Sequence, residues 1–600
     1  MKSGKTVRIG GACGFLGDTS ISTPQLISGG NVDYIVYDYL AEVTMSLLAR
    51  VKAKRPDMGY AHYFTDVIIT ENIREIAKQG IRIVSNAGGV NPGACRDKVL
   101  EIAKKAGIEL KVAVIQGDDL MPRLEELKQK NITEMYTGEH WPDGMMSINA
   151  YLGARPIADA LAAGADIVIT GRVVDSALTL GPLMNEFGWP DEEYDLLAQG
   201  SLAGHIIECG AQATGGLHTD WELVPDWTNI GYPVVECYSD GSFLVTKPPE
   251  TGGLVNPATV GEQLLYEIGD PQAYFLPDVV CDFSQVNIEQ TDIDTVRVTG
   301  AIGRPPTDTY KVYAAYHDGY RCIAVLPVIG FDAARKAERQ SKAVIERMQS
   351  IFRQKNLGDY RDTLIESMGA ESSYGPHSKS RETREVACKI SVEHDKREAL
   401  EIFAREVYAP TTSMSPGSTG WFTGRPAVAP VIKLFSFLIS KKELPVAVIV
   451  GKEAKPVDVR IEGGFNPDKI VRPDVPEAIR VDGDMDTVPL IHLAWGRSGD
   501  KGNSCNIGII ARKAKYLPYI RSALTEAAVQ YYMAHVFEGA VNPKVERFEL
   551  PGINALNFLL HESLGGGQMA SLRMDPLAKG MAQQLLDFPI PISAGVLEKV

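Results

Sequence analysis

The sequence predicts a two-domain α/β protein: a large doubly wound domain on a mostly parallel sheet, followed by a small α+β domain. A chain of 600 residues is too long for a single hydrophobic core. In the first third, short apolar runs alternate with amphipathic helical patterns, which is typical of parallel strands covered by helices on both faces. A polar, proline-rich stretch at 453–485 is the predicted linker between a large domain at 1–452 and a small domain at 486–600.

The predicted strands of the large domain are short runs rich in β-branched residues. Each is followed by a glycine-containing loop and, in most cases, a helical pattern, and right-handed crossovers connect such units. The predicted strands are "VRIGGA" (7–12), "VDYIVYDY" (32–39), "IRIVSNAGG" (81–89), "ELKVAVIQGDD" (109–119) and "DIVITG" (166–171).

The pattern of apolar and polar residues changes from about residue 225. Alternating apolar and polar residues broken by turn signals at 281–330 predict an antiparallel, β-rich insertion. Amphipathic helices follow at 333–352 and 396–409, and then a long loop at 410–430 that contains Trp421 and Arg425. A loop of this length is either a functional lid or a disordered segment. The small domain repeats a strand and helix alternation that suggests a ferredoxin-like fold.

Composition limits the classes of function. The hydrophobic fraction of 44% and the charged fraction of 23% are ordinary for a soluble globular protein, and the net charge of -15 argues against nucleic acid or an anionic membrane as a partner. No uncharged apolar stretch is long enough to span a membrane, and the N-terminus runs directly into a strand pattern. The eight cysteines are scattered singly, without a CxxC pair, which fits a reducing cytoplasm. We therefore expect a cytoplasmic protein, and a homo-oligomer is common for such chains.

Polar side chains gather in the loops that follow the predicted parallel strands. Ligands of open parallel sheets bind outside the carboxyl ends of the strands, so these loops predict an active site. Glycine, Asp and Asn are also ordinary turn formers and helix caps, which is the alternative interpretation. The residues brought to this edge are Asp18, Asp38, Glu42, Asn86, Asn91, Asp118, Asp119, Arg172 and Asp175.

Two of these loops are rich in glycine. "GACGFLGD", with Gly14 and Gly17, has GxxGxxG spacing rather than a dinucleotide fingerprint, so NAD binding is weakly supported. "SNAGGVNPGA" ends a strand and opens a helix, and its N–H groups could hold a phosphate or carboxylate of a substrate. The alternative is a tight turn with proline near the helix start. The candidate binding residues of this second loop are Asn86, Gly88, Gly89 and Asn91.

Three carboxylates are candidate metal ligands. Asp38 and Glu42 are four residues apart and share a face if the segment is helical, and Asp18 ends the first strand loop. Together they could bind Mg²⁺ or another divalent cation, or divide acid and base roles between them. The alternative is a solvated helix start with favourable placement relative to the helix dipole.

A helix rich in Ala and Gly at 196–216 carries His205, Glu208 and Cys209 on one face. Because small residues allow close packing, Glu208 is expected to be partly buried. A buried carboxyl beside an imidazole is suited to general acid or base catalysis. The alternative is a satisfied core histidine in a structural ion pair.

Six long motifs carry a family resemblance. Three lie in the last quarter: "GRSGDKGNSCNIGIIAR" (496–512), "RFELPGINALNFLL" (547–560) and "LGGGQMASLRMDPLAKGMAQQLL" (564–586). Three lie in the large domain: "RIGGACGFLGD" (8–18), "ITGRVVDSALTLGP" (169–182) and "LAGHIIECGAQATGG" (202–216). Together they resemble the acyclic terpene utilisation (AtuA) family over essentially the whole chain.

The resemblance implies acyl-CoA catabolism. The family's namesake belongs to a bacterial pathway that degrades citronellol and geraniol, and is proposed there as a lyase that splits a branched 3-hydroxy-3-methylglutaryl-type CoA thioester. The alternatives are a hydratase on the same substrates, or a non-catalytic acyl-CoA-binding or assembly subunit. A lyase needs a base, an acid and an electrophile for the thioester oxygen, for which a divalent metal often serves. The candidate catalytic residues are Asp18, Asp38, Glu42, Arg172, Asp175, His205 and Glu208.

The glycine-rich loop "GRSGDKGN" is predicted to join two strands of the small domain. As a hypothesis, it offers N–H groups and charges to a CoA phosphate or a substrate carboxylate at the domain interface; the alternative is a solvated surface hairpin. "LGGGQMASLR" supplies a second such loop. The candidate CoA-binding residues of the two loops are Arg497, Ser498, Asp500, Lys501 and Arg573.

Overall fold

The large domain is built on a sheet whose centre is parallel. The computed structural model describes residues 4–420, 424–476 and 485–597. The five central strands are β1 (Thr6–Gly11), β2 (Tyr34–Tyr37), β3 (Arg82–Ser85), β4 (Val112–Gln116) and β6 (Ile167–Ile169). They lie in the order β1-β2-β3-β6-β4, and every pairing among them is parallel.

Antiparallel strands extend the sheet on both sides. Beyond β1 lie β7 (Val234–Tyr238), β8 (Phe243–Thr246), β12 (Thr295–Thr299) and β11 (Asn287–Asp292), and beyond β4 lie β18 (Ala447–Val450) and β19 (Glu453–Pro456). Within the described residues, most neighbouring pairs of this sheet are therefore antiparallel. The prediction of a mostly parallel sheet holds for the centre and is wrong for the whole, because the later strands return as hairpins instead of crossing over through helices.

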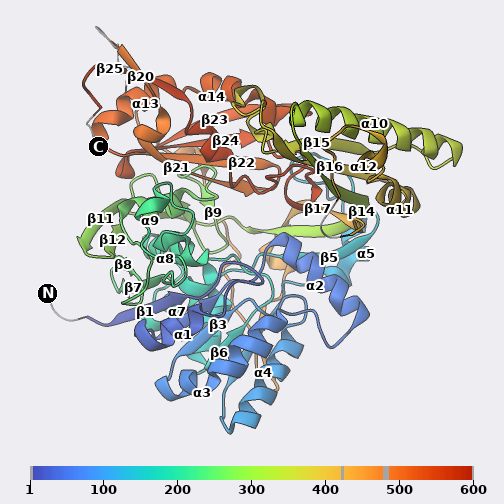
Figure 1. Cartoon of the computed structure of the whole chain (residues 1–600). Coiled ribbons are helices and arrows are strands. Elements are labelled where there is room, and N and C mark those ends of the chain that lie inside the picture. The colour runs from blue at the N-terminus through green and yellow to red at the C-terminus, as the bar shows by residue number, and fades with distance from the viewer. Residues whose placement is uncertain (1–3, 421–423, 477–484, 598–600) are drawn as a thin grey trace.

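Helices cover both faces of the parallel centre (Figure 1). On one face lie α1 (Ser22–Gly29), α2 (Glu42–Lys54), α3 (Thr70–Gln79) and α4 (Pro92–Ala106), and on the other α6 (Arg155–Ala162), α7 (Ala177–Phe187) and α8 (Tyr194–Ile207). Alternate strand residues supply the two cores: Ile35 packs with the first set and Val36 with the second. Both faces of the strands are apolar for this reason, as the sequence predicted.

A second, fully antiparallel sheet contains the longest strand of the predicted β-rich insertion at 281–330, whereas β11 and β12 of that segment join the large sheet. Its strands are β5 (Met145–Ala150), β14 (Thr309–Ile329), β15 (Asp362–Met368), β16 (Glu385–His394) and β17 (Val428–Ser440). Helices α10 (Ala333–Gln354) and α11 (Arg397–Glu406) pack on it. A small sheet of β9 (Tyr274–Phe275), β10 (Val280–Asp282) and β13 (Ile302–Arg304) and helices α5 (Leu124–Gln129), α9 (Pro257–Leu265) and α12 (Pro410–Ser413) complete the domain. Trp421, in the predicted lid, lies outside the described residues.

The small domain is an α+β unit with its own core. Its sheet has the order β21-β22-β24-β23, with β21 (Ala494–Lys501), β22 (Ser504–Ala511), β23 (Lys544–Leu550) and β24 (Ala555–His561). Helices α13 (Leu517–Ala523), α14 (Glu526–Tyr532) and α15 (Met581–Leu585) and a pair of strands, β20 (Met485–Pro489) and β25 (Pro589–Ser593), complete it. Most of the "GRSGDKGN" stretch (496–503) belongs to β21, and only its last two residues, Gly502 and Asn503, form the turn that joins β21 to β22.

The described part of the predicted linker lies along the large domain. Its first residues form β19, which pairs with β18. Further on, Gly464 N donates to Pro306 O, and Arg472 forms an ion pair with Asp270 at 2.5 Å. Residues 477–484 lie outside the described residues, so the domain boundaries at 452 and 486 stay a prediction. Among the residues described, no helix combines the length and apolarity needed to cross a membrane, and all eight cysteines are free thiols.

Buried amides dock the small domain onto the segment that follows α9. Asn506 on β22 donates to Leu265 O at 2.7 Å and accepts from Glu267 N at 2.9 Å. Asn557 on β24 donates to Ile268 O at 2.8 Å and accepts from Asn506 at 2.9 Å. Both side chains are almost fully buried. The pair thus satisfies the turn's backbone groups where water cannot reach them.

Replacing Asn506 with Ala should lower the free energy of unfolding by about 3 kcal/mol, because it leaves buried backbone partners unsatisfied. The measurement is denaturant unfolding at constant pH. Asn542→Ala is the control, since this exposed side chain has no hydrogen-bond partner among the described residues and its loss should cost less than about 0.5 kcal/mol. Equal stability of the two variants would contradict the docking role.

Candidate functional site

The loops after the parallel strands meet at one edge of the sheet, as the sequence predicted. Asn86, after β3, donates to the Asp38 carboxylate, after β2, at 2.5 Å. Cys13, after β1, donates its thiol to Asp38 O at 3.3 Å. Arg172, after β6, donates through Nη1 to Leu40 O at 2.8 Å. Four strand ends are therefore connected by direct hydrogen bonds.

Arg172 is the buried cation of this edge, with only 3% of its surface exposed. Its Nη1 also donates to Asp175 at 2.7 Å, and its guanidinium carbon lies 4.5 Å from the ring centre of Tyr151. Its backbone N–H donates to Asp118 at 2.8 Å. The Nε atom is buried and has no hydrogen-bond partner among the residues that the structure describes. Arg172 is thus held in place by its neighbours while one of its donors stays unused.

Glu42 links this edge to the small domain. The Tyr151 hydroxyl donates to one Glu42 oxygen. The side-chain amide of Gln568, in the small domain, lies 3.2 Å from the other Glu42 oxygen and 3.2 Å from Asp500. One amide nitrogen therefore touches a carboxylate from each domain, which makes the site composite.

Lys501 is the exposed cation of the cluster. It comes from the tip of the β21-β22 hairpin and lies 3.1 Å from Glu267, with half of its side chain exposed. Burial acts to lower the pKa of Lys501, but the charges of Glu267, Asp175 and Glu42 outweigh it and raise that pKa well above its usual value. An ammonium group therefore faces carboxylates of the large domain.

The carboxyl groups of the cluster have widely separated acidities. Burial alone would raise the pKa of Glu42, but Arg172, Lys311 and the Tyr151 hydroxyl lower it to about 2. Burial raises the pKa of Asp500 to about 8, and the charge of Glu267 adds to the effect. At neutral pH one site thus holds an ionised carboxylate beside a protonated carboxyl.

Two further carboxyl groups have pKa values between these extremes. Burial raises the pKa of Asp175 to about 6, although the charge of Arg172 opposes the rise. Burial also raises the pKa of Asp118 to about 6, while the hydrogen bond from the Arg172 N–H works against it. Asp38 follows the same rule, because burial and the charge of Asp175 raise its pKa well above the usual value. Such perturbed values gather where proton transfer is required.

The predicted metal site is not assembled. Asp18 accepts from Gly14 N at 3.0 Å and from the Tyr232 hydroxyl at 2.7 Å, whereas Asp38 and Glu42 have the separate partners described above. Within residues 4–420, 424–476 and 485–597, no three His, Cys, Asp or Glu side chains are arranged to hold a metal ion. Asp18, Asp38 and Glu42 therefore do not form one ligand cluster in the described part of the chain, and Asp18 acts as a loop anchor; a divalent cation stays a prediction.

The predicted His205–Glu208 pair is present and lies in the core. His205 Nδ1 lies 2.9 Å from a Glu208 oxygen, and Nε2 lies 3.2 Å from Leu264 O. His205 is 1% exposed. The second Glu208 oxygen is buried without a hydrogen-bond partner in the described part of the chain, and the charge of Glu208 acts on Asp175 and Asp38. Glu208 thus borders the polar cluster, while His205 faces away from solvent.

The predicted glycine positions are explained by close packing within the chain. A Cβ atom at Gly14 would lie 2.7 Å from the Cys209 backbone, and one at Gly88 would lie 2.4 Å from Thr170 O. Gly89 adopts φ +54 and faces Leu48, whereas Gly17 adopts φ +102 beside open space. Asn91 donates to Pro56 O at 3.0 Å and to Met58 O at 2.7 Å, so it ties two loops together.

The charged residues of the small-domain loops face different ways. Arg497 donates to Leu217 O at 3.2 Å and to Gln212, and Ser498 donates to Ala578 O at 2.6 Å. Arg573 donates to Val536 O at 2.7 Å. The side chains of Arg497, Ser498 and Arg573 are therefore already hydrogen-bonded within the chain. Of the five predicted CoA-binding residues, Lys501 presents the largest exposed charge to a ligand.

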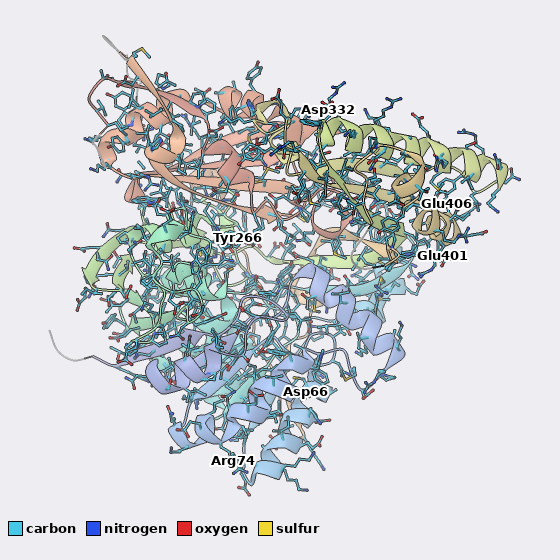
Figure 2. The ribbon with its side chains drawn as sticks, viewed as in Figure 1. Asp66, Arg74, Tyr266, Asp332, Glu401 and Glu406 are labelled. Atoms are coloured by element: carbon cyan, nitrogen blue, oxygen red, sulfur yellow. The ribbon has the colours of Figure 1, made fainter. Side chains whose placement is uncertain are left out.

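Sequence reasoning missed Tyr151, Glu267, Tyr274 and Gln568. Tyr151 follows β5, a strand that the sequence did not predict, and Glu267 and Tyr274 lie in a segment without a motif. The charges of Lys501 and Glu208 both act on the Tyr274 hydroxyl, so Tyr274 borders the cluster. Figure 2 shows Tyr266, the neighbour of Glu267, where the large domain meets the small one. Gln568 lies within the motif "LGGGQMASLR", and this motif was the only sequence feature that could have indicated one of the four residues.

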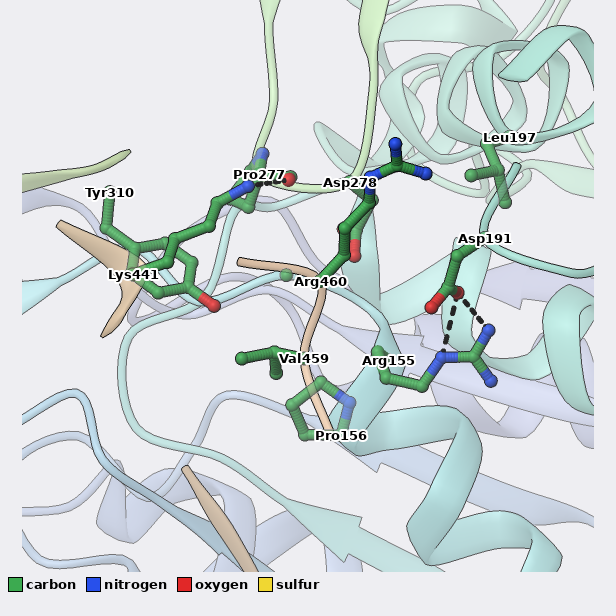
Figure 3. Close-up of a pocket in the computed structure, with 11 residues that line it drawn as sticks. Arg155, Pro156, Asp191, Leu197, Pro277, Asp278, Tyr310, Lys441, Val459 and Arg460 are labelled. Atoms are coloured by element: carbon green, nitrogen blue, oxygen red, sulfur yellow. Dashed lines mark hydrogen bonds and ion pairs between the residues drawn. The ribbon is translucent and has the colours of Figure 1, made fainter. Parts of the chain in front are cut away.

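A second polar pocket lies apart from this cluster (Figure 3). Lys441 donates to Pro277 O and Thr307 O, both at 2.7 Å, and Arg155 donates to Asp191 at 2.9 Å. The cavity volume is about 20 Å³, room for about one water molecule. Because Lys441 and Arg155 are already hydrogen-bonded within the chain, we interpret this pocket as a structural feature and not as a binding site.

The fold and site together define a two-domain α/β protein with a composite, charged site between the domains. A model of the acyclic terpene utilisation family protein AtuA matches residues 7–450, and a model of the AtuA ferredoxin-like domain matches residues 488–591. The chain belongs to the AtuA family. Comparison with curated proteins and with solved structures found no match.

Asp500 should make the folded state more stable at low pH. Its folded pKa of about 8 exceeds the unfolded value near 4, so the folded state holds a proton that the unfolded state releases, and this stability is lost as the pH rises from about 4 to 8. Asp500→Asn should remove this loss and be more stable than wild type at pH 8 by at least about 1.4 kcal/mol, the value of one pKa unit. Denaturant unfolding at pH 5 and pH 8 measures it; a difference that does not grow with pH would contradict it.

Proposed function

We propose that this AtuA family member is a carbon–carbon lyase that acts on a branched 3-hydroxyacyl-CoA thioester in acyclic terpene utilisation. The observation that carries the proposal is the composite cluster, in which an ammonium group and carboxyl groups of very different acidity meet between two domains. The family membership supports the pathway, and the cluster supports the reaction type.

The reaction has simple requirements. A base removes the proton from the tertiary 3-hydroxyl, the C2–C3 bond breaks, and its electron pair passes into the thioester as an enolate. The 3-hydroxyl carbon becomes a ketone. The enolate then takes a proton at C2, which releases an acetyl thioester. No oxidant, reductant or added water is consumed.

Asp175 is the proposed base. With a pKa of about 6, it is ionised at neutral pH yet basic enough to accept a proton. Its side chain is 30% exposed, so a ligand can reach it, and its hydrogen bond to Arg172 fixes its orientation. Glu42, with a pKa of about 2, is too weak a base for this role.

Asp500 is the proposed acid. Its pKa of about 8 keeps it protonated at neutral pH, and Gln568 holds it beside Glu42. Carboxyl pairs whose environments push their pKa values apart are the usual basis for dividing acid and base roles.

Lys501 is the proposed electrophile for the enolate oxygen. An ammonium group held in place beside buried carboxyl groups, as Lys501 is by Glu267, stabilises a developing oxyanion without having to reorient during the reaction. This assignment gives the chain its own cation, so the mechanism needs no step through a divalent metal. Asp18, Asp38, His205 and Glu208 keep positioning roles in this scheme.

Turnover of branched 3-hydroxyacyl-CoA thioesters by the purified protein tests the proposal, with products read by mass spectrometry in the presence and absence of Mg²⁺. We expect an acetyl thioester and a ketone, with kcat lowered about 100-fold or more in Lys501→Met. Lys104→Met is the control and should match wild type, because Lys104 is exposed on α4 and forms no ion pair within the described ranges. Gain or loss of water would instead identify a hydratase, and binding without turnover an assembly subunit; either result would overturn the lyase.

The dependence of kcat/KM on pH is a separate test. The base and acid assigned above predict a bell-shaped profile with limbs near pH 6 and pH 8, since kcat/KM reports ionisations of the free enzyme. Asp500→Asn should abolish the upper limb together with most of the activity, whereas Asp97→Asn, at an exposed position on α4, should leave both limbs in place. A limb near pH 8 that persists in the residual activity of Asp500→Asn would remove Asp500 from the mechanism.

A further inference from the structure

A hollow of about 310 Å³ lies beside the helix that carries Glu42. Its lining includes Arg50 on α2, His317 and Tyr320 on β14, Arg397 at the start of α11, and Pro430 and Ile432 on β17. The volume is at the lower end of the range for small-molecule sites, about 300–1,000 Å³. We propose that this hollow binds the nucleotide end of a coenzyme A thioester. The inference rests on the proposed function.

The hollow carries positive charge without an acidic lining residue. Arg50 is half-buried and forms no hydrogen bond or ion pair with the part of the chain that the structure describes. Asp318, which follows His317 in the sequence, is already paired with Arg361 at 2.7 Å and with Lys433 at 2.6 Å, and Glu398, which follows Arg397, is exposed. In a chain with a net charge of -15, an unpaired and partly buried arginine points to an anionic ligand.

Arg397 is available to the same ligand. Arg397 forms an ion pair with Glu401 at 3.0 Å, and both side chains are more than half exposed. Exposed pairs of this kind contribute about 0–1 kcal/mol, so a phosphate can displace Glu401 at little cost. Two guanidinium groups at one hollow suit a ligand with more than one phosphate, because each can bind two oxygens at once.

Aromatic rings provide a surface for a base. The rings of His317 and Tyr320 are 5.0 Å apart in an edge-to-face arrangement, and both side chains are half-buried. The register of β14 against β17 shifts between these two residues, a bulge of the kind that redirects side chains. Stacking on an aromatic ring contributes about 1–3 kcal/mol per nucleobase, whichever base it is. Phosphate anchors and a stacking platform together are the recognition elements of a nucleotide.

The position of the hollow matches the shape of a CoA thioester. Arg50 follows Glu42 by eight residues on α2, about 12 Å along the helix axis. Helix α2 packs against β5, β14 and β17, so one set of elements connects the hollow to the cluster. In Figure 2, Glu401, the partner of Arg397, lies at about the same height as Tyr266, toward the right edge of the view. The flexible pantetheine arm of CoA can bridge this separation between the thioester and the nucleotide.

Calorimetric titration of the full-length protein with CoA and with adenosine 3′,5′-bisphosphate tests the site. Arg50→Gln should weaken the binding of both at least about 10-fold, because a charge-assisted hydrogen bond contributes about 1.5–3 kcal/mol. Arg397→Gln should act in the same direction. The matched control is Arg74→Gln: Arg74 is exposed on α3, has no partner among the described residues, and lies at the far end of the large domain in Figure 2. Unchanged CoA affinity in a folded Arg50→Gln protein would overturn the proposal.

The two proposals fail in different ways. If CoA binding depends on Arg50 but no thioester is cleaved, the lyase is wrong and the nucleotide site stands. If the protein cleaves a thioester truncated to pantetheine with the same kcat/KM as the CoA thioester, the nucleotide site is wrong and the lyase stands. Equal melting temperatures of Arg50→Gln and wild type would show that the loss of affinity is not a loss of fold.

Discussion

The docking of the small domain through two buried asparagines is the constraint on which the site depends. Asn506 and Asn557 hold the turn after α9 by its backbone, and the same hairpin that carries Asn506 carries Asp500 and Lys501. Because both amides are fully paired, the hairpin has one well-defined position against the large domain. The charged cluster is therefore set by a neutral hydrogen-bond network next to it.

The cluster shows how burial and charge act against each other in one small volume. Glu42 and Asp500 touch the same amide of Gln568, yet one is strongly acidic and the other is protonated at neutral pH. The difference arises because Arg172 and Lys311 act on Glu42, whereas burial and Glu267 dominate at Asp500. Neither value is a property of the residue type, and neither domain alone would produce the pair.

The sequence predicted the parts of the site that local rules control. Parallel strands must place their following loops at one edge, so Asp38, Asn86, Arg172 and Asp175 could be found from strand patterns alone. Glu267 could not, because a hairpin that is remote in the chain brings its partner Lys501 to it. The pairing of antiparallel strands onto the edges of the large sheet was missed for a similar reason, since the choice of an edge partner depends on tertiary packing and leaves little trace in periodicity.

The covalent connection between the domains has a consequence for assembly. Strand β19 and the segment beyond it keep contact with the large domain before the chain enters the small one. If the two parts were separate polypeptides, each encounter would depend on their concentrations, whereas the connection makes docking intramolecular, with a high effective concentration. A single chain therefore guarantees one hairpin, and one Lys501, for every set of strand-end carboxylates at any level of expression.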